Sequence, residues 1–419
     1  GSPVPDGRTY CGLVDHLHHR GPDEGGFWTQ GPFFLGHRRL SIVGVESGQQ
    51  PMATRDGELA VTFNGELFNH RELRQDLERR GHAFQTSCDT EVLLHGYREW
   101  GRSLPERLTG QFAFAIADVA HGELFVARDR FGEKPLLLLR TSTHLAFASE
   151  LRPLAALPWF QRRIDEVALG DYLVLNYVPD ARTMAVGVER LPPATWRVYE
   201  AGGRVTSSTY WQPPERERPE TSRLEPALGE WRERFDRAVR LALSSDVPVA
   251  VLLSGGIDSS LVAESAVRQG GVRDAYVLDV PGPRFSERAA AEEVSRRLGL
   301  RLESVPLSPP TGDDLLAIAS HADDPLADSS AIAVKALARG TARRHKVALG
   351  GGGGDELFGG YLTYRATLFH ARRVATLPQL LRRALARAAT FVPSSERKVA
   401  TSYKVARFLR AAALPSSAA

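Results

Sequence analysis

The feature that most constrains the fold is an apolar run at residues 247–253 that leads through a glycine turn into a helical pattern. The turn reads Ser254-Gly255-Gly256-Ile257-Asp258-Ser259-Ser260. Strand, glycine turn and helix in this order place backbone N–H groups and hydroxyls at the positive end of a helix, where they can hold an anion. Apolar runs at 275–280 and 346–349 and a helical pattern at 286–298 continue the alternation. This alternation predicts a doubly wound parallel α/β sheet with its site at the carboxyl ends of the strands.

The first half of the chain has a different pattern. Short β-rich runs are separated by turn residues and interrupted by two amphipathic helical stretches, at 71–80 and 90–100. The runs lie at 59–63, 112–117, 124–127, 136–139 and 145–148. This pattern predicts antiparallel sheets with a few helices. A Pro-rich charged stretch follows Trp211 and is typical of a linker. We therefore expect one domain at 1–211, a linker at 212–228 and a second domain at 229–419.

Composition limits the class of protein. With 42% hydrophobic and 25% charged residues, this is an ordinary globular chain. Two cysteines build neither a disulfide framework nor a four-thiolate zinc site. No apolar stretch approaches about 20 residues, and no signal pattern opens the sequence. We expect a cytoplasmic protein without a membrane partner.

Charge gives little support for nucleic-acid binding, because the net charge is only +3. From Tyr361 onward, eleven Lys and Arg face a single acid, Glu396. Such a segment could be a nucleic-acid or membrane surface. Its arginines are interleaved with Ala and Leu at helical spacing, which favours an ordinary amphipathic helix. We expect no nucleic-acid partner.

The glycine turn at 254–260 has a definite chemistry. A phosphate loop of the Gly-x-x-x-x-Gly-Lys type needs a lysine, and this turn has none. The turn therefore suits pyrophosphate, held by backbone dipoles and a metal, better than γ-phosphoryl transfer. Asp258 could hold magnesium. The alternative is a tight strand-to-helix turn without a ligand.

This turn resembles the pyrophosphate loop of the ATP-pyrophosphatase superfamily. Three more motifs have the order and spacing of the glutamine-dependent asparagine synthetase family: Phe285-Ser286-Glu287, Asp323-Asp324-Pro325-Leu326-Ala327-Asp328-Ser329-Ser330 and Gly354-Asp355-Glu356-Leu357-Phe358-Gly359-Gly360-Tyr361. The resemblance implies that ATP and Mg²⁺ activate a carboxylate, by default aspartate, as its acyl-adenylate. It implies magnesium ligation by Asp258 and Asp355, and an ATP site at Leu253, Ser254, Gly255, Gly256, Asp258, Ser259, Leu278, Gly350 and Gly351.

Motifs of the first half are similar to the family's class II glutamine amidotransferase domain. They are His19-Arg20-Gly21-Pro22-Asp23-Glu24-Gly25, Gly36-His37-Arg38-Arg39-Leu40-Ser41-Ile42, Asn64-Gly65-Glu66-Leu67-Phe68-Asn69, Asp89-Thr90-Glu91 and Ala127-Arg128-Asp129-Arg130-Phe131-Gly132-Glu133-Lys134-Pro135. The resemblance, which runs from about His19 to Tyr361, implies an N-terminal-nucleophile αββα sandwich ahead of the α/β domain.

The implied glutamine site has readable chemistry. Arg39 suits the α-carboxylate of glutamine through a charge-assisted fork. Asp89 and the carboxylate or backbone carbonyl of Glu66 suit the α-ammonium group. The family places its oxyanion hole at the Asn64 amide and the Gly65 N–H, where preformed donors stabilise a tetrahedral intermediate. An isolated Asn-Gly pair would instead predict a hairpin turn.

The sequence departs from the family at the nucleophile. Class II amidotransferases use a cysteine as the first residue of the mature chain, because its α-amine can act as the base. This sequence opens Gly1-Ser2. Cys11 maps to the helix before the Arg-Gly-Pro-Asp motif, and we expect it to be structural. Cys88 could approach the glutamine pocket but has no free amine. Either the nucleophile-bearing strand is missing from the sequence as given, or the glutaminase is inactive.

A second departure concerns the glycine run. The family generally has serine where Gly350 stands and an acidic residue where Gly352 stands. In the family that acid is implicated in substrate handling or base chemistry, so its replacement by glycine bears on the acceptor-amine step and on the identity of the acid substrate. Nothing after Tyr361 matches the family's continuation, which includes a lysine that assists adenylation. We expect Lys335, Lys346, Lys398 and Lys404 to be surface residues.

Three hypotheses remain open. The first is an amidotransferase that takes glutamine, ATP and aspartate or a related acid and releases amide, AMP and pyrophosphate. The second is an adenylating cyclase or amide synthetase without glutaminase activity, like β-lactam synthetases or lasso-peptide cyclases. The third is a catalytically silent homologue. A homodimer is an expectation from the family alone.

Overall fold

The structure is a computed structural model that describes residues 7–214, 224–282, 286–388 and 401–412. Most of the expected linker, Phe285, Glu396 and Lys398 lie outside the described residues, and so does the side chain of Lys404. The chain divides into two compact units, residues 1–350 and 351–419, and each is described by itself. Within the first unit, residues 7–214 are called the N-terminal half and residues 224–350 the parallel-sheet half.

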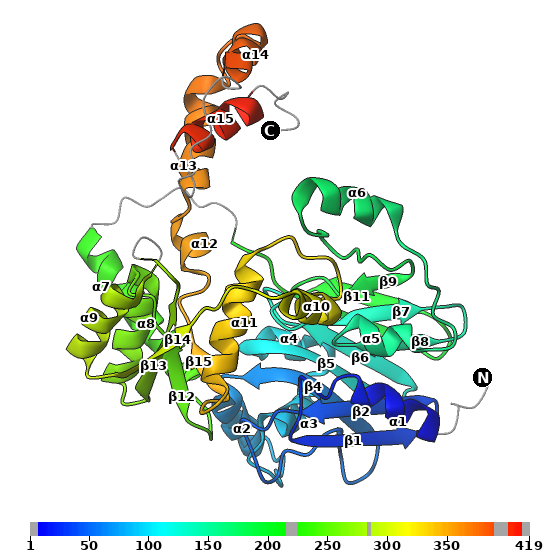
Figure 1. Ribbon diagram of the computed structural model, residues 1–419. Coiled ribbons are helices and arrows are strands. Elements are labelled where there is room, and N and C mark those ends of the chain that lie inside the picture. The colour runs from blue at the N-terminus through cyan, green and yellow to red at the C-terminus, as the bar shows by residue number, and fades with distance from the viewer. Residues whose placement is uncertain (1–6, 215–223, 283–285, 389–400, 413–419) are drawn as a thin grey trace. The chain divides into compact units, whose positions relative to one another are not determined.

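The N-terminal half contains three antiparallel sheets (Figure 1). The largest has the strand order β11-β10-β6-β5-β4-β3. Its strands are β3 (Met52–Ala53), β4 (Leu59–Leu67), β5 (Gly110–Asp118), β6 (Glu123–Arg128), β10 (Thr195–Glu200) and β11 (Val205–Thr209). Two smaller sheets form a second layer. One is the pair β1 (Glu24–Gln30) and β2 (Phe33–Arg39). The other has the strand order β8-β7-β9, with β7 (Leu137–Arg140), β8 (Leu145–Ala148) and β9 (Val188–Arg190).

Alternation along β5 explains why both of its faces are apolar. Phe112, Phe114 and Ile116 belong to one core, with residues of α2 (His70–Arg79) and α3 (Asp89–Trp100). Ala113, Ala115 and Ala117 belong to a second core, between the sheet layers. Because side chains of a strand point alternately to its two faces, a strand buried on both sides is apolar throughout.

Strand β7 of the second sheet layer is buried on both faces in the same way. Leu138 of β7 packs in the core between the sheets. Leu137 and Leu139 pack outward, in a third core with residues of α1 (Gly7–Asp15) and α5 (Leu151–Ala155). Helix, sheet, sheet and helix layers follow one another, and this confirms the predicted αββα sandwich. Short helices η1 (Gly101–Ser103), α4 (Leu104–Arg107) and α6 (Glu166–Leu175) complete this half.

The parallel-sheet half has the strand order β14-β13-β12-β15, and every pairing is parallel. Its strands are β12 (Val249–Leu252), β13 (Val272–Asp279), β14 (Arg301–Pro306) and β15 (Val347–Leu349). One face packs on α7 (Leu224–Ala242), α8 (Ile257–Arg268) and α9 (Arg288–Leu298). The other face packs on α11 (Ser330–Thr341), which α10 (Gly312–His321) precedes. Helices on both faces confirm the doubly wound prediction.

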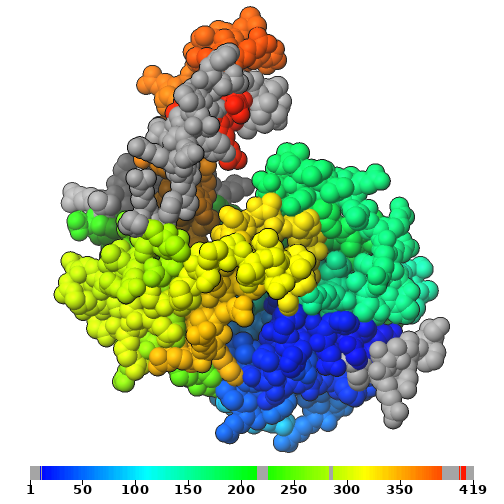
Figure 2. Space-filling view, in the orientation of Figure 1, coloured from blue at the N-terminus to red at the C-terminus, as the bar shows by residue number. Residues whose placement is uncertain are grey.

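The two halves of the first unit touch directly. Figure 2 shows the yellow surface of the parallel-sheet half beside the cyan-to-green surface of the N-terminal half. There the Leu151 N–H donates to Asp323 Oδ1 at 2.6 Å, and the Met184 N–H donates to Asp324 Oδ1 at 2.6 Å. Asp324 also pairs with Arg190. The acidic pair of the Asp323 motif therefore joins the halves.

The second unit is helical. It contains α12 (Gly354–Phe358), α13 (Leu362–Phe369), the π-helical turn η2 (His370–Val374), α14 (Gln379–Ala388) and α15 (Thr401–Ala412). The basic residues of α14 recur with Ala and Leu at helical spacing, as expected for an amphipathic helix. Across the part of the chain that the structure describes, no helix is long and apolar enough to cross a membrane.

Candidate functional site

One large cavity in the N-terminal half collects every residue predicted to bind glutamine. Its volume is about 1040 Å³. Arg39 is the last residue of β2, Asp89 is the first residue of α3, and residues 64–66 lie on β4. The cavity is lined, among others, by Arg39, Asn64, Gly65, Glu66, Cys88 and Asp89. Residues far apart in sequence thus form one polar wall.

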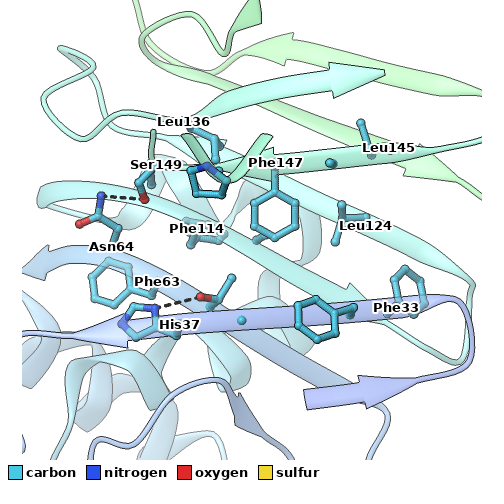
Figure 3. A pocket seen from close by; sticks show the side chains of 18 of the residues that line it. Phe33, His37, Phe63, Asn64, Phe114, Leu124, Leu136, Leu145, Phe147 and Ser149 are labelled. Carbon is cyan, nitrogen blue, oxygen red and sulfur yellow. Dashed lines mark hydrogen bonds between the residues drawn. The ribbon is translucent and has the colours of Figure 1, made fainter. Parts of the chain in front are cut away.

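The Asn64-Gly65 pair lies within a strand, so the hairpin interpretation is wrong. Asn64 pairs with Ala113 and Gly65 with Phe112 across the β4–β5 ladder. The Asn64 Nδ2 group donates to Ser149 Oγ at 3.4 Å (Figure 3). This contact orients the amide and leaves its second Nδ2 hydrogen for another acceptor.

Two carboxyl groups lie close together in this wall. Burial, reinforced by the charge of Asp89, raises the pKa of Glu66 to about 7. Burial also raises the pKa of Asp89, although its Oδ2 atom accepts the Leu67 N–H at 3.0 Å. Glu66 Oε1 is buried and has no hydrogen-bond partner. An ammonium group supplies both a donor for that oxygen and a compensating positive charge.

Arg39 is 5% exposed, and its two terminal nitrogens are already engaged. Nη1 donates to Glu24 Oε2 at 3.0 Å and to the Val45 carbonyl at 3.2 Å. Nη2 donates to the carbonyls of Val43 and Gly44 at 3.0 and 2.8 Å. A ligand carboxylate can therefore bind Arg39 with both oxygens only if it replaces some of these carbonyls as hydrogen-bond acceptors.

Two more titratable groups line the cavity. Burial, aided by the charge of Arg39, lowers the pKa of His37 to about 4, so this imidazole is neutral at pH 7. Burial raises the pKa of the Cys88 thiol to about 11, which makes it a poor nucleophile. Sequence reasoning did not single out His37, although it belongs to the Gly36-His37-Arg38 motif. Cys11 lies in α1, the helix ahead of the Arg-Gly-Pro-Asp motif.

Away from the polar wall, the cavity continues as an apolar channel between β2 and β8. Figure 3 shows Asn64 and Ser149 toward one end and Leu124, Leu145 and Phe33 toward the other. Among the described strands, β2 pairs with β1 and β8 pairs with β7, so each has an edge without a partner strand. The sheet with β4 and β5 lies on one side of the channel, and residues of α1 and α5 line the other.

The predicted anion loop has the expected form. It joins β12 to α8, with Gly255 at φ +75° and Gly256 as an N-cap that makes no side-chain cap. Ser254 Oγ and Ser259 Oγ are 2.9 Å apart, and the Gly256 N–H donates to Ser254 Oγ at 3.2 Å. The first N–H groups of an uncapped helix have no acceptor within the helix, so they are free for an anion.

The other predicted ATP residues of the first unit lie at the same sheet edge. Leu253 follows β12, Leu278 is near the end of β13, and Gly350 follows β15. The pairings Leu252 with Tyr276 and Val251 with Leu349 bring these carboxyl ends level. Gly351 and Asp355 belong to the second unit, where Asp355 lies in the first turn of α12.

The arrangement fits magnesium as a partner of phosphate better than as a protein-caged ion. In the described parts of the chain, no group of three or more His, Cys, Asp or Glu residues could hold a metal ion. Magnesium commonly takes one or two carboxylates plus substrate phosphates. Asp258, in the first turn of α8, is such a carboxylate beside the anion loop.

The Asp129 motif has a structural role. Its carboxylate is 1% exposed and accepts the backbone N–H groups of Phe112, Phe131, Glu133 and Lys134 at 3.0–3.2 Å. These bonds fix the turn that brings Lys134 to the cavity.

Replacing Asp129 with alanine is expected to lower the free energy of unfolding by at least about 3 kcal/mol, because each buried N–H left unpaired costs about 1–3 kcal/mol. Urea denaturation of Asp129→Ala measures this. The exposed Glu106→Ala is the control and should change stability by about 0.5 kcal/mol or less. A loss below 1 kcal/mol for Asp129→Ala would contradict the interpretation.

Lys346 is exposed, as expected from the sequence, and it also forms an ion pair that the sequence did not predict. Its Nζ donates to Asp23 Oδ2 at 2.6 Å, across the boundary between the halves. That contact and the Ser41 N–H lower the pKa of Asp23. Lys335 pairs with Asp314 at 3.3 Å within the parallel-sheet half.

Comparison with known proteins gives two family matches. A family described as a glutamine amidotransferase domain matches residues 5–211, and one described as asparagine synthase matches residues 230–417. The second match extends well beyond Tyr361, so the expectation that the family resemblance stops there was wrong. The glutamine-hydrolysing asparagine synthetase 1 of Bacillus subtilis is 35% identical over 380 residues, which cover 90% of this chain and 60% of that protein. The amidase chyE of Penicillium rubens is 32% identical over 411 residues, covering 90% and 59%.

The chain spans about three-fifths of the length of these curated relatives. Among solved structures, the allosteric regulatory enzyme of purine biosynthesis aligns with a TM-score of 0.34 and 20% identity, over 67% of this chain and 68% of that one.

Proposed function

Because the chain belongs to the glutamine-hydrolysing asparagine synthetase family, we propose that it forms an amide at the expense of ATP. In this reaction, ammonia released from glutamine attacks the acyl-adenylate of aspartate or a related carboxylate and yields amide, AMP and pyrophosphate. The observation that carries the proposal is the presence, in one compact unit, of the polar cavity wall and the uncapped helix start.

In the proposed glutamine site, each group has a defined task. The α-ammonium group binds the partnerless Glu66 Oε1 and the carboxyl of Asp89. The α-carboxylate accepts hydrogen bonds from Arg39, and it replaces the loop carbonyls of Val43 and Gly44 as the acceptor. The Asn64 amide, oriented by Ser149, and the Gly65 N–H stabilise the oxyanion.

In the proposed nucleotide site, the N–H groups at the start of α8 and the hydroxyls of Ser254 and Ser259 hold the phosphates. Asp258 would hold Mg²⁺. The same role is proposed for Asp355, in the second unit, from the family motif alone. The metal, when bound, offsets the charge that develops on the leaving pyrophosphate. Leu253, Leu278, Gly350 and Gly351 complete the proposed ATP site. We also propose domain limits of 1–211 and 229–419, joined by 212–228.

Glycine at 350 bears on the acid substrate. A Cβ atom at this position would meet only Leu252 Cδ1, at 3.9 Å, so packing within the first unit leaves room for a side chain. Because glycine has no side chain, the space at this sheet edge is larger than it would be with serine at position 350. The larger space supports the proposal that the substrate is either aspartate or a related carboxylic acid.

Pyrophosphate release tests the proposed function. With ATP, Mg²⁺ and an ammonium salt, the chain should release pyrophosphate when the correct carboxylic acid is added. Aspartate and a panel of related acids are compared with a mixture that contains no acid. Release that never exceeds the acid-free rate would instead support the catalytically silent alternative.

Glutamine binding is expected to strengthen as the pH rises through about 7. The pKa of Glu66 is about 7, above its ordinary value of 4.5, so at lower pH the site must lose a proton before it can pair with an ammonium group. The affinity should therefore fall by up to about tenfold for each pH unit below 7, since one pKa unit corresponds to about 1.4 kcal/mol. Calorimetric titration between pH 5.5 and 8.5 measures it.

Glu66→Gln should bind glutamine weakly and lose the dependence near pH 7. The exposed Glu58→Gln should keep it. The same raised pKa has a cost in stability: between about pH 4.5 and 7 the folded state binds more protons than the unfolded state, so this group lowers stability as the pH rises. A pH-independent affinity in the wild type would contradict the assignment.

A further inference from the structure

A short loop, residues 41–45, lies against the proposed glutamine site; we call it the bridging loop. Its carbonyls at Val43, Gly44 and Val45 accept the terminal N–H groups of Arg39. It also packs on Cys88, because a Cβ atom at Gly44 would come within 2.7 Å of Cys88 Cβ. Cys88 directly precedes Asp89. The loop therefore contacts both sides of the proposed amino-acid site.

The same loop is bonded to the parallel-sheet half at two points. At one, the Gly44 N–H donates to Asp246 Oδ2 at 2.8 Å, and the Asp246 N–H donates to the Ile42 carbonyl at 3.2 Å. At the other, Asp23 Oδ2 accepts both Lys346 Nζ at 2.6 Å and the Ser41 N–H at 2.8 Å. These contacts join residues about 200 to 320 positions apart.

Both attachment points lie at the amino ends of strands that lead to the proposed nucleotide loops. Asp246 stands three residues before β12, which runs into Ser254. Lys346 stands immediately before β15, which runs into Gly350. The two strands are hydrogen-bonded neighbours from Val249 and Val347 onward. A displacement of the bridging loop therefore acts on the two strands that carry the nucleotide loops.

We propose that Asp246 and Lys346 are positioning residues that couple the occupancy of the two sites through the bridging loop. The inference rests on the proposed function. When the carboxylate of glutamine accepts hydrogen bonds from Arg39, Arg39 no longer donates to the carbonyls of the bridging loop. The loop then moves, and its contacts with Asp246 and Lys346 transmit this movement to β12 and β15. By thermodynamic reciprocity, a nucleotide that fixes the carboxyl ends of these strands changes the affinity for glutamine by the same factor.

The test is calorimetric and uses the whole chain. The affinity for L-glutamine is measured with and without saturating α,β-methylene-ATP and Mg²⁺. We expect the wild-type affinity to change by about fivefold or more, within the usual range of allosteric coupling. In Asp246→Ala and in Lys346→Met the ratio should approach one, while each ligand alone still binds. Asp246→Asn keeps an acceptor for the Gly44 N–H and should restore most of the ratio.

Matched controls come from the parallel-sheet half. Lys335→Met removes a lysine–aspartate pair, with Asp314, that does not cross to the N-terminal half. Asp236→Asn alters a carboxylate bonded to Ser265 and Arg268. Both should retain the wild-type ratio. A wild-type ratio of one, or an unchanged ratio in Asp246→Ala and Lys346→Met, overturns the coupling. Failure of the wild type to bind either ligand overturns the proposed function as well.

Discussion

Gly255→Ala is expected to weaken nucleotide binding by about 30-fold or more. Gly255 has φ +75°, a conformation that costs an L-residue about 1–2 kcal/mol. A Cβ atom there would lie 2.5 Å from Ala290 Cβ and 2.6 Å from the Ala290 carbonyl carbon, and overpacking of this kind costs about 1–3 kcal/mol. The variant loop must either keep its conformation with both energetic penalties or adopt another conformation. In both cases the affinity for nucleotide should fall about 30-fold or more. Calorimetric titration with α,β-methylene-ATP and Mg²⁺ measures the loss.

The neighbouring glycine provides the control. Gly256 has an ordinary extended conformation, and a Cβ atom there would meet only Ser254 Oγ, at 3.2 Å. Gly256→Ala should therefore bind nucleotide far better than Gly255→Ala. Thermal unfolding of both variants separates loss of binding from loss of folding. If Gly255→Ala bound as tightly as the wild type, the anion loop would not be the nucleotide site.

Strands buried on both faces were predictable from the sequence. The run at 112–117 became the centre of β5, and the run at 247–253 became β12 with its flanking residues. Such strands are continuously apolar, and this pattern depends on neither partner nor register. The helices predicted at 71–80 and 90–100 correspond to α2 and α3, because their apolar spacing follows the helical repeat.

Two edge strands, β1 and β14, were not predicted, although the runs at 145–148 and 346–349 did identify the edge strands β8 and β15. β1, with the sequence Glu-Gly-Gly-Phe-Trp-Thr-Gln, is rich in glycine and partly exposed, so it carries no clear alternation. β14 is an edge strand with only one strongly buried residue, Val305. Their strand geometry is imposed by pairing with neighbours, which a local pattern does not record.

The candidate site shows the same limit. The sequence motifs identified Arg39, Asn64 and Asp89 as candidate site residues, and all three line the same cavity. No motif predicted that Lys346 would reach Asp23, since a contact across more than 300 residues has no periodic signature. The sequence therefore identifies groups that act on a ligand more readily than the contacts that connect two sites.

The second large effect concerns the apolar channel between β2 and β8. We expect a peptide of about six residues, the length of an ordinary strand, to confer glutaminase activity if it begins with cysteine and continues with β-branched apolar residues. Among the strands that the structure describes, β2 and β8 each leave one edge unpaired at the channel, and together with the apolar lining these edges suit one added strand. Its polar end holds Asn64, so a cysteine there would lie beside the proposed oxyanion site. Ammonia release from glutamine is measured with and without the peptide.

Three matched peptides separate the chemistry from the binding. A serine in first position keeps the strand but removes the thiolate, and an N-acetylated cysteine keeps the thiol but removes the amine that acts as its base. Both should bind and give no ammonia. A peptide with proline at its third position should not bind, because proline removes a donor from the ladder. Equal activity from free and acetylated cysteine would contradict the proposed base, and activity without any peptide would assign the nucleophile to this chain's own residues, of which Cys88 lines the cavity.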